Sequence, residues 1–140
     1  MYRVLMPVDE NVDRSMSQGQ YIADLPAAVD SIEVTVLYVS DETDRSESDT
    51  DKPEPQPEDI ESVTRVMGFF DEQNIRYRTV IDRDNPVERI LEYVHEIEAN
   101  VIVLGGRKRS PTGKVLFGSV TMSVLRNTDI PVVVTGETSE

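Results

Sequence analysis

Five short apolar segments, separated by longer polar stretches, constrain the fold of this chain most strongly. They cover residues 3–8, 32–39, 75–81, 101–104 and 131–135. All are rich in valine and isoleucine, and most are continuously apolar, without the alternation of a half-exposed strand. Continuous runs of this length are typical of strands that are covered on both faces. The sequence therefore predicts a buried sheet of five strands.

Helical patterns lie between these segments. Apolar residues recur at helical spacing after Pro86, a favoured residue for a first helical turn. A second pattern covers residues 60–70, a third follows Ser119, which can cap a helix, and a weaker one covers residues 12–25. Strands that alternate with helices predict a mostly parallel α/β sheet with right-handed crossovers. The residues expected to face the core are Met16, Ile22, Ile60, Val63, Met67, Phe70, Val87, Ile90, Leu91, Val94, Ile97, Val120, Val124 and Leu125.

Residues 41–59 interrupt the alternation of strands and helices. They contain nine acidic residues and three prolines but no residue that would be buried in a core. This composition predicts a flexible, solvated acidic loop and not a second domain. A metal-binding role for its carboxylates is a weaker alternative. We expect residues 1–140 to form a single domain around this loop.

Composition narrows the possible compartments and sites. The chain has no cysteine, which excludes disulfides and thiolate metal sites and is compatible with a reducing interior. No apolar run reaches 18 residues, and the first segment meets Asp9 too early for a signal peptide. We therefore expect a soluble, cytoplasmic protein.

The net charge of −13 bears on partners and environment. Such a chain repels phosphate backbones and anionic lipid, so we expect neither nucleic acid nor a membrane as a partner. Only three of its 14 cationic residues are lysines. Acid excess combined with a preference for arginine indicates a halophilic protein, because carboxylates keep a surface hydrated in high salt. Ordinary acidic solubility is the alternative.

The most informative local pattern lies between residues 101 and 134. An apolar run ends in Gly105-Gly106, four cations follow within residues 107–114, and Phe117-Gly118-Ser119 opens the last predicted helix. Glycines let an anion approach the backbone, and the N–H groups at a helix N-terminus bind it. The local reversal of charge in an acidic chain suggests a bound phosphate. The cations are Arg107, Lys108, Arg109 and Lys114.

Asp9 is the second candidate site residue. It follows the first predicted strand, and ligands of open α/β sheets bind at the carboxyl ends of strands where the strand order reverses. The ends of the first, second and fourth strands meet there if the first and fourth are neighbours. Asp9 can then accept a hydrogen bond from the amino group of a base. The alternative is that it caps the helix that begins near Val12.

Several common sites are excluded. The phosphate-binding P-loop needs glycine at position 108 and serine or threonine at position 115, where the chain has Lys108 and Val115. The dinucleotide motif G-x-G-x-x-G is also missing. The one histidine, His95, stands among acids in a predicted helix and is expected on the surface, so a nucleophilic triad has no support. Ligands for a tight metal site are lacking as well.

Taken together, these residues resemble the universal stress protein family along the whole chain. The resemblance is carried by Val4-Leu5-Met6-Pro7-Val8-Asp9, by Val36-Leu37-Tyr38-Val39 and by Asn85-Pro86 with Ile90. Val101-Ile102-Val103-Leu104-Gly105, Phe117-Gly118-Ser119-Val120-Thr121 and Pro131-Val132-Val133-Val134 complete it. The resemblance implies one three-layer α/β/α sandwich, Rossmann-like, whose five-stranded parallel sheet has the order 3-2-1-4-5.

The nucleotide-binding branch of that family carries the motif G-x2-G-x9-G-[ST]. Gly105 and Gly118-Ser119 match it, whereas Lys108 replaces the middle glycine. A lysine loses conformational freedom there but supplies a cation. By resemblance, Pro7, Asp9 and Val39 contact adenine, Leu104 and Gly105 lie near the ribose and first phosphates, and Gly118, Ser119, Val120 and Thr121 hold the distal phosphates. Arg107 and Lys108 are expected beside the phosphates because of their charge.

The resemblance implies a small stress-response protein that binds ATP, with Mg or Mn carried by the phosphates, and acts as a dimeric binding module or switch. Slow ATP hydrolysis is the most activity expected, because no residue looks like a dedicated base for water. The alternative is a dimeric interaction protein of the same family that binds no nucleotide. In both, the homodimer forms through the last strand, residues 131–135, which begin at Pro131 and end at Thr135. A third possibility is that a different anion or a regulatory small molecule binds in the same pocket.

Overall fold

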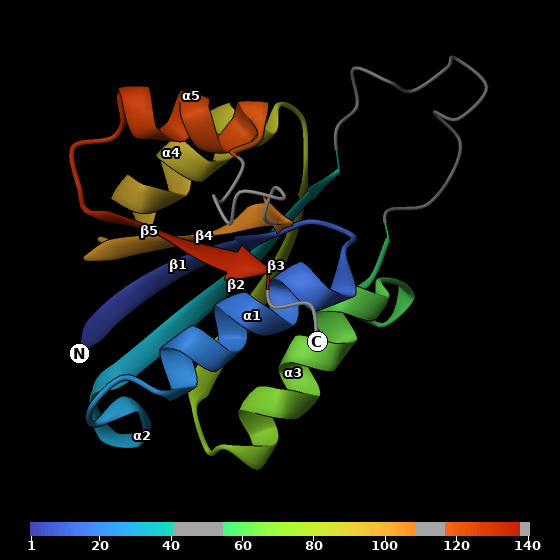
Figure 1. The fold of residues 1–140 in the computed structure, drawn as a ribbon, viewed down its shortest axis with the longest axis vertical. Helices are drawn as coiled ribbons and strands as arrows, with labels where there is room; N and C mark the ends of the chain where they lie inside the picture. The colour runs from blue at the N-terminus through green and yellow to red at the C-terminus, as the bar shows by residue number, and fades with distance from the viewer. Residues whose placement is uncertain (41–54, 109–116, 138–140) are drawn as a thin grey trace.

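A five-stranded parallel sheet forms the centre of the molecule (Figure 1). The computed structural model describes residues 1–40, 55–108 and 117–137. The strand order is β3-β2-β1-β4-β5, and all four neighbouring pairs are parallel. This confirms the predicted α/β fold and its strand order. The strands are β1 (Tyr2–Val8), β2 (Ile32–Ser40), β3 (Arg76–Arg83), β4 (Val101–Lys108) and β5 (Val132–Glu137).

Helices cover both faces of the sheet. On one face lie α1 (Val12–Ala23) and α3 (Glu61–Glu72), and on the other lie α4 (Pro86–Glu96) and α5 (Ser119–Asn127) (Figure 1). The short helix α2 (Ala28–Ser31) connects α1 to β2. Two apolar clusters result, one under α1 and α3 around Phe70 and one under α4 and α5 around Ile102. Both faces are therefore buried, as the continuous apolar runs predicted.

Two helices bury different residues from those expected. In α3, Val66 is fully buried and Met67 is only partly buried, because the inward stripe is centred on Val63, Val66 and Phe70. In α5, Leu125 is 37% exposed, whereas Thr121 is buried beside Val124. Several apolar residues compete for one face in each segment, so spacing alone could not rank them. His95 is exposed in α4, as predicted.

Three local expectations were wrong or incomplete. β4 continues through Gly105 and Gly106 to Lys108, so these glycines form no turn, and the pairing with β5 is irregular between Gly105 and Lys108. Gly118, in extended conformation, is the N-cap of α5, so Ser119 is its first helical residue and not its cap. The end of the predicted acidic loop forms a 3-10 turn, η3 (Pro57–Asp59). Residues 41–54 of that loop and 109–116 of the basic segment lie outside the described residues.

Candidate functional site

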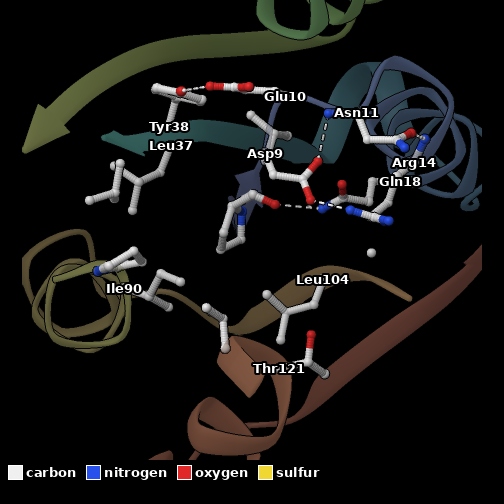
Figure 2. Close-up of a pocket in the computed structure, with 16 residues that line it drawn as sticks. Asp9, Glu10, Asn11, Arg14, Gln18, Leu37, Tyr38, Ile90, Leu104 and Thr121 are labelled. Carbon is white, nitrogen blue, oxygen red and sulfur yellow. Dashed lines mark hydrogen bonds and ion pairs between the residues drawn. The ribbon is translucent and has the colours of Figure 1, made fainter. Parts of the chain in front are cut away.

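A cavity of about 480 Å³ lies at the carboxyl ends of β1, β2 and β4 (Figure 2). The helices α1, α4 and α5 direct their N-terminal ends toward it, as the residues that line it show. Its position at the point where the strand order reverses is the usual ligand crevice of an open α/β sheet. The lining residues are Pro7, Val8, Asp9, Glu10, Asn11, Arg14, Gln18, Leu37, Tyr38, Val39, Pro86, Ile90, Leu104, Gly105, Val120 and Thr121.

The cavity opens because β1 and β4 are paired only near their starts. Their register joins Val4 to Val101 and Leu5 to Ile102, whereas β1 pairs with β2 along its whole length. Gln18 bridges the gap. Its side-chain amide, 1% exposed, donates to the Pro7 carbonyl at 2.6 Å and to the Val103 carbonyl at 3.0 Å. A buried amide from α1 thus satisfies carbonyls of both strands where they separate.

Asp9 lies at the rim of this gap, with a side chain that is 52% exposed. One carboxylate oxygen accepts from the Asn11 N–H at 2.9 Å, and the other pairs with Arg14. The cap of α1 is Asn11, whose side chain accepts from the Arg14 N–H at 2.8 Å, so the alternative role of Asp9 as helix cap is wrong. An ionised carboxylate has about four acceptor positions, so Asp9 keeps capacity for a ligand.

The loop that carries Asp9 is also fixed from the side of α3. The buried Ser62 hydroxyl donates to the Asp9 carbonyl at 2.6 Å. Ser62 stands in the first turn of α3, directly after the segment that begins with η3. The position of Asp9 therefore depends on a contact between residues 53 apart in the chain, which sequence patterns alone do not indicate.

Arg14 is the principal site residue that sequence reasoning missed. Its side chain, 20% exposed, runs from α1 across the end of β4, where Nε donates to the Gly106 carbonyl at 3.2 Å. A Cβ at Gly105 would lie 2.7 Å from Arg14 Cδ and 3.1 Å from Gln18 Oε1. The absence of a side chain at Gly105 therefore makes room for Arg14, whereas the sequence interpretation had reserved that space for a phosphate.

Tyr38 and Glu10 close the cavity on the side of β2. The Tyr38 hydroxyl donates to the Glu10 carboxylate at 3.0 Å. Burial, followed by this hydrogen bond and the negative charge of Glu10, raises the pKa of Tyr38 to about 12. The tyrosine is therefore neutral at physiological pH and holds Glu10 at the end of β2.

Apolar side chains form the remaining wall. Val39, Val120 and Ile90 belong to the cluster under α4 and α5, and Leu37 and Leu104 are buried in the same cluster. Pro7 and Pro86 contribute from the end of β1 and the start of α4. A mostly apolar cavity with a few polar groups at its rim is typical of sites for small organic ligands.

The N-terminus of α5 provides a polar edge opposite Asp9. The first helical hydrogen bond runs from the Met122 N–H to the Gly118 carbonyl, and no side chain of residues 1–40, 55–108 or 117–137 caps the helix. The N–H groups of Ser119, Val120 and Thr121 thus precede the helical ladder. Thr121 is only 5% exposed, its hydroxyl has no hydrogen-bond partner among the described residues, and it points toward the cavity (Figure 2).

Arg107 places a cation beside this helix end. Its Nε lies 3.4 Å and its Nη2 3.7 Å from the position that a Cβ would take at Gly118. Arg107, Gly118 and Ser119 stand outside the cavity lining, at its α5 side. Lys108 ends β4 in register with Glu137.

The structure thus gathers Pro7, Asp9, Val39, Leu104, Gly105, Val120 and Thr121 around one cavity and leaves Arg107, Gly118 and Ser119 beyond its edge. Of Lys108 only the backbone is described, at the end of β4. Glu10, Asn11, Arg14, Gln18, Tyr38 and Pro86 also line it and were not predicted. In the described ranges, no group of three histidine, cysteine or acidic side chains could hold a metal ion. In the same ranges, no helix combines the length and apolar character that a membrane crossing requires.

The fold and the cavity define a parallel α/β protein with a crevice for a small ligand at its strand-order reversal. Comparison with known families identifies the family within this class of proteins. The model of the universal stress protein family matches residues 1–136, and the chain belongs to that family.

Individual relatives agree with this assignment. The chain is 33% identical over 92 residues to the stress response protein NhaX of Bacillus subtilis strain 168. That match covers 62% of this chain and 54% of NhaX, so the chain spans about half the length of this relative.

Solved structures share the fold at lower identity. The universal stress protein of Archaeoglobus fulgidus in complex with dAMP has a TM-score of 0.69 at 19% identity, covering 96% of this chain and 98% of that one. A universal stress protein in complex with cAMP has a TM-score of 0.65 at 16% identity, covering 97% of each chain. At these identities the comparison establishes the fold, and the ligands belong to those two proteins.

Proposed function

We propose that this protein binds an adenine nucleotide, with ATP as the physiological ligand, in the cavity at the ends of β1, β2 and β4. The observation that carries the proposal is the pairing of an apolar cavity with two polar ends. Asp9 offers acceptors at one end, and the α5 N-terminus offers donors at the other, with the Thr121 hydroxyl, which bonds to no described residue. Two proteins of the same fold are complexes with dAMP and cAMP.

The residues present fit such a ligand in size and chemistry. A cavity of about 480 Å³ lies within the range of sites for small organic ligands, about 300–1,000 Å³. Pro7 and Val39 would pack on the base, whose amino group would donate to Asp9. Phosphates would extend past Leu104 and Gly105 toward Gly118 and Ser119, with Arg107 beside them.

The metal would arrive with the nucleotide. Phosphate oxygens bind Mg²⁺ together with few protein ligands, so a dedicated cluster of carboxylates is unnecessary. We therefore expect Mg or Mn to be carried by the phosphates of the bound ATP. The chemistry it would supply is charge neutralisation of the triphosphate.

We infer that the molecule acts as a cytoplasmic stress-response module or switch that forms a homodimer through residues 131–135. None of the described side chains at the cavity forms an arrangement that would activate water, so hydrolysis is expected to be slow at most. Nucleic acid and membranes are not expected as partners, because the chain carries a net charge of −13. The competing function is a dimeric interaction protein without nucleotide, which Lys108 in the motif favours.

Calorimetric titration with Mg-ATP separates these two functions. The wild type should bind, and Gly118→Val should abolish binding because a branched side chain would stand where phosphate approaches the α5 N-terminus. The same change should leave the fold intact, since the nearest described neighbour of a Cβ at Gly118 is the flexible Arg107 side chain. An undetectable wild-type affinity at millimolar nucleotide would favour the interaction protein.

Two milder variants refine the phosphate end. Ser119→Ala should weaken ATP binding by about 1–3 kcal/mol, the range that covers hydrogen bonds to charged groups and buried partners left unpaired. Lys108→Gly weakens binding and flattens its salt dependence if the lysine contacts phosphate. It tightens binding if the lysine merely blocks a backbone contact.

A further inference from the structure

The guanidinium of Arg14 holds hydrogen-bond donors that no described residue of the chain accepts. Its Nε donates to the Gly106 carbonyl at 3.2 Å, and Nη1 pairs with Asp9. A guanidinium carries five N–H donors. The remaining donors, including both on Nη2, have no acceptor among the described residues. Arg14 nevertheless lines the cavity, with a side chain that is only 20% exposed (Figure 2).

Arg14 differs in charge from the other described residues that line the cavity. The described cavity wall has two carboxylates, Asp9 and Glu10, and Arg14 is its one lysine or arginine. Glu10 accepts from Tyr38, whereas the charge of Asp9 is offset by Arg14. A phosphate that entered without Arg14 would meet an unpaired carboxylate, and like charges at contact distance repel strongly in a partly buried site.

The position of Arg14 along the cavity is fixed by its stem. Cγ and Cδ pack on the bare Cα of Gly105, and the Gly106 carbonyl holds Nε, so the head group lies between Asp9 and the end of β4. Gln18, one turn later in α1, also lies close to Gly105, with Oε1 3.1 Å from the position that a Cβ would take there. The guanidinium is therefore held between the base end and the phosphate end of the proposed ligand.

We propose that Arg14 is a specificity-determining residue that donates to the first phosphate of the bound nucleotide, the one attached to the nucleoside. The inference rests on the proposed adenine-nucleotide function and deepens it. The planar guanidinium of arginine forms charge-assisted hydrogen bonds with phosphate, often two at once. These bonds are stronger than those that it forms with the neutral hydroxyls of a ribose. Arg14 then separates Asp9 from the phosphate and lets one cavity hold both an acceptor for the base and an anion.

The test compares ligands that differ only in phosphate. Adenosine, AMP and ATP are titrated calorimetrically into the wild type, Arg14→Gln and Arg14→Lys. Glutamine retains part of the stem over Gly105 and an amide N–H for the Gly106 carbonyl. Arg126→Gln is the matched control, because it removes the same charge from an exposed residue at the far end of α5. Thermal melting verifies that each variant is folded.

We expect Arg14→Gln to weaken the binding of AMP and of ATP by similar factors, about 10-fold or more. This is the effect of losing one charge-assisted hydrogen bond. The affinity of Arg14→Gln for adenosine should differ from that of the wild type by no more than about 2-fold. The affinities of Arg14→Lys for AMP and ATP should lie between those of the wild type and Arg14→Gln. Lysine retains the positive charge but not the planar set of N–H donors. The Arg126→Gln control should bind all three ligands like the wild type.

Two results would overturn the role of Arg14 while leaving the nucleotide function in place. One is an equal loss for adenosine and AMP, which would mean that Arg14 acts only by positioning Asp9. The other is unchanged affinity for all three ligands. If the wild type binds none of them, the proposed function fails, and the inference fails with it.

Discussion

Single side chains decide how the cavity is built, and Gln18 is the clearest case. Its amide is the donor for carbonyls of β1 and β4 at the place where the two strands separate. Two further residues hold Asp9 in place. Arg14 pairs with its carboxylate from α1, and Ser62 donates to its backbone carbonyl from α3. The polar rim is therefore held by long-range contacts of buried or half-buried polar groups, which cost free energy when one partner is lost.

Gln18→Ala should lower the free energy of unfolding by about 1–3 kcal/mol for each buried carbonyl left without a donor. Gln20→Ala is the matched control on the same helix. Gln20 is exposed, and among the described residues its side chain bonds only to Asp24, so its loss should cost no more than about 0.5 kcal/mol. Urea unfolding of the two variants measures the difference. Equal small losses would show that the bridge between the strands contributes little.

The ionisation of Tyr38 offers a second test at the same scale. Because its pKa is raised to about 12 in the folded state, the unfolded chain releases this proton at lower pH. The stability that depends on neutral Tyr38 is complete below about pH 10 and is lost as pH rises toward 12. The unfolding free energy of Tyr38→Phe should therefore decline less steeply than that of the wild type above pH 10. Parallel declines would contradict the raised pKa of Tyr38 and the burial and Glu10 contact that cause it.

Whole elements were the part of this structure that the sequence predicted best. The apolar runs located all five strands, and Pro86 with its apolar stripe located α4. These signals are local, since burial on both faces or on one helical stripe leaves a pattern in consecutive residues. Boundaries were less accurate. β4 continues past its glycines because Thr135 and Glu137 of β5 pair with it, a fact that no local pattern contains.

The candidate site was predicted only in part, for the same physical reason. Asp9 and the glycines could be located because they follow strands or open a helix. Arg14 and Gln18 could not, because they stand in the weakest helical pattern and look like ordinary surface residues. Their partners Gly106 and Val103 are 92 and 85 residues away. No sequence signal short of a contact prediction would have found them.

The start of α1 gives a prediction for an element. Asn11→Ala removes the side chain that accepts from the Arg14 N–H and should cost about 0.5–2 kcal/mol of stability. Asn11→Ser should restore most of this loss, because serine caps helices about as well as asparagine. Thermal or urea unfolding measures both variants. A loss with alanine that serine does not reduce would mean that Asn11 stabilises the loop by another contact.

The whole molecule presents two different sheet edges. β3 carries Arg76, Arg78 and Arg83 and is the kind of charged edge that resists further pairing. β5 lies at the other edge, where Val132, Val133 and Val134 are only partly buried and no strand of the described ranges lies beyond them. This contrast supports residues 131–135 as the surface through which two copies would pair.

Dimer formation should depend on salt. Two chains of net charge −13 repel each other, and this repulsion is screened over about 10 Å at 0.1 M salt and about 3 Å at 1 M. Sedimentation at tens of micromolar protein should therefore show a dimer in high salt and weaker association in low salt. A monomer in high salt would argue against pairing through β5. The same screening would stabilise each chain if its acidity is an adaptation to high salt.

The central claim is that an adenine nucleotide occupies the cavity between Asp9 and the N-terminus of α5. The most direct measurement is the amide NMR spectrum of isotope-labelled protein titrated with Mg-ATP. We predict saturable shifts of the amides of Asp9, Gly105, Ser119 and Thr121, while amides at the opposite ends of the strands, such as Arg3 and Arg76, stay unchanged. A spectrum without shifts at millimolar nucleotide, or with shifts confined to residues away from the cavity, would contradict the account.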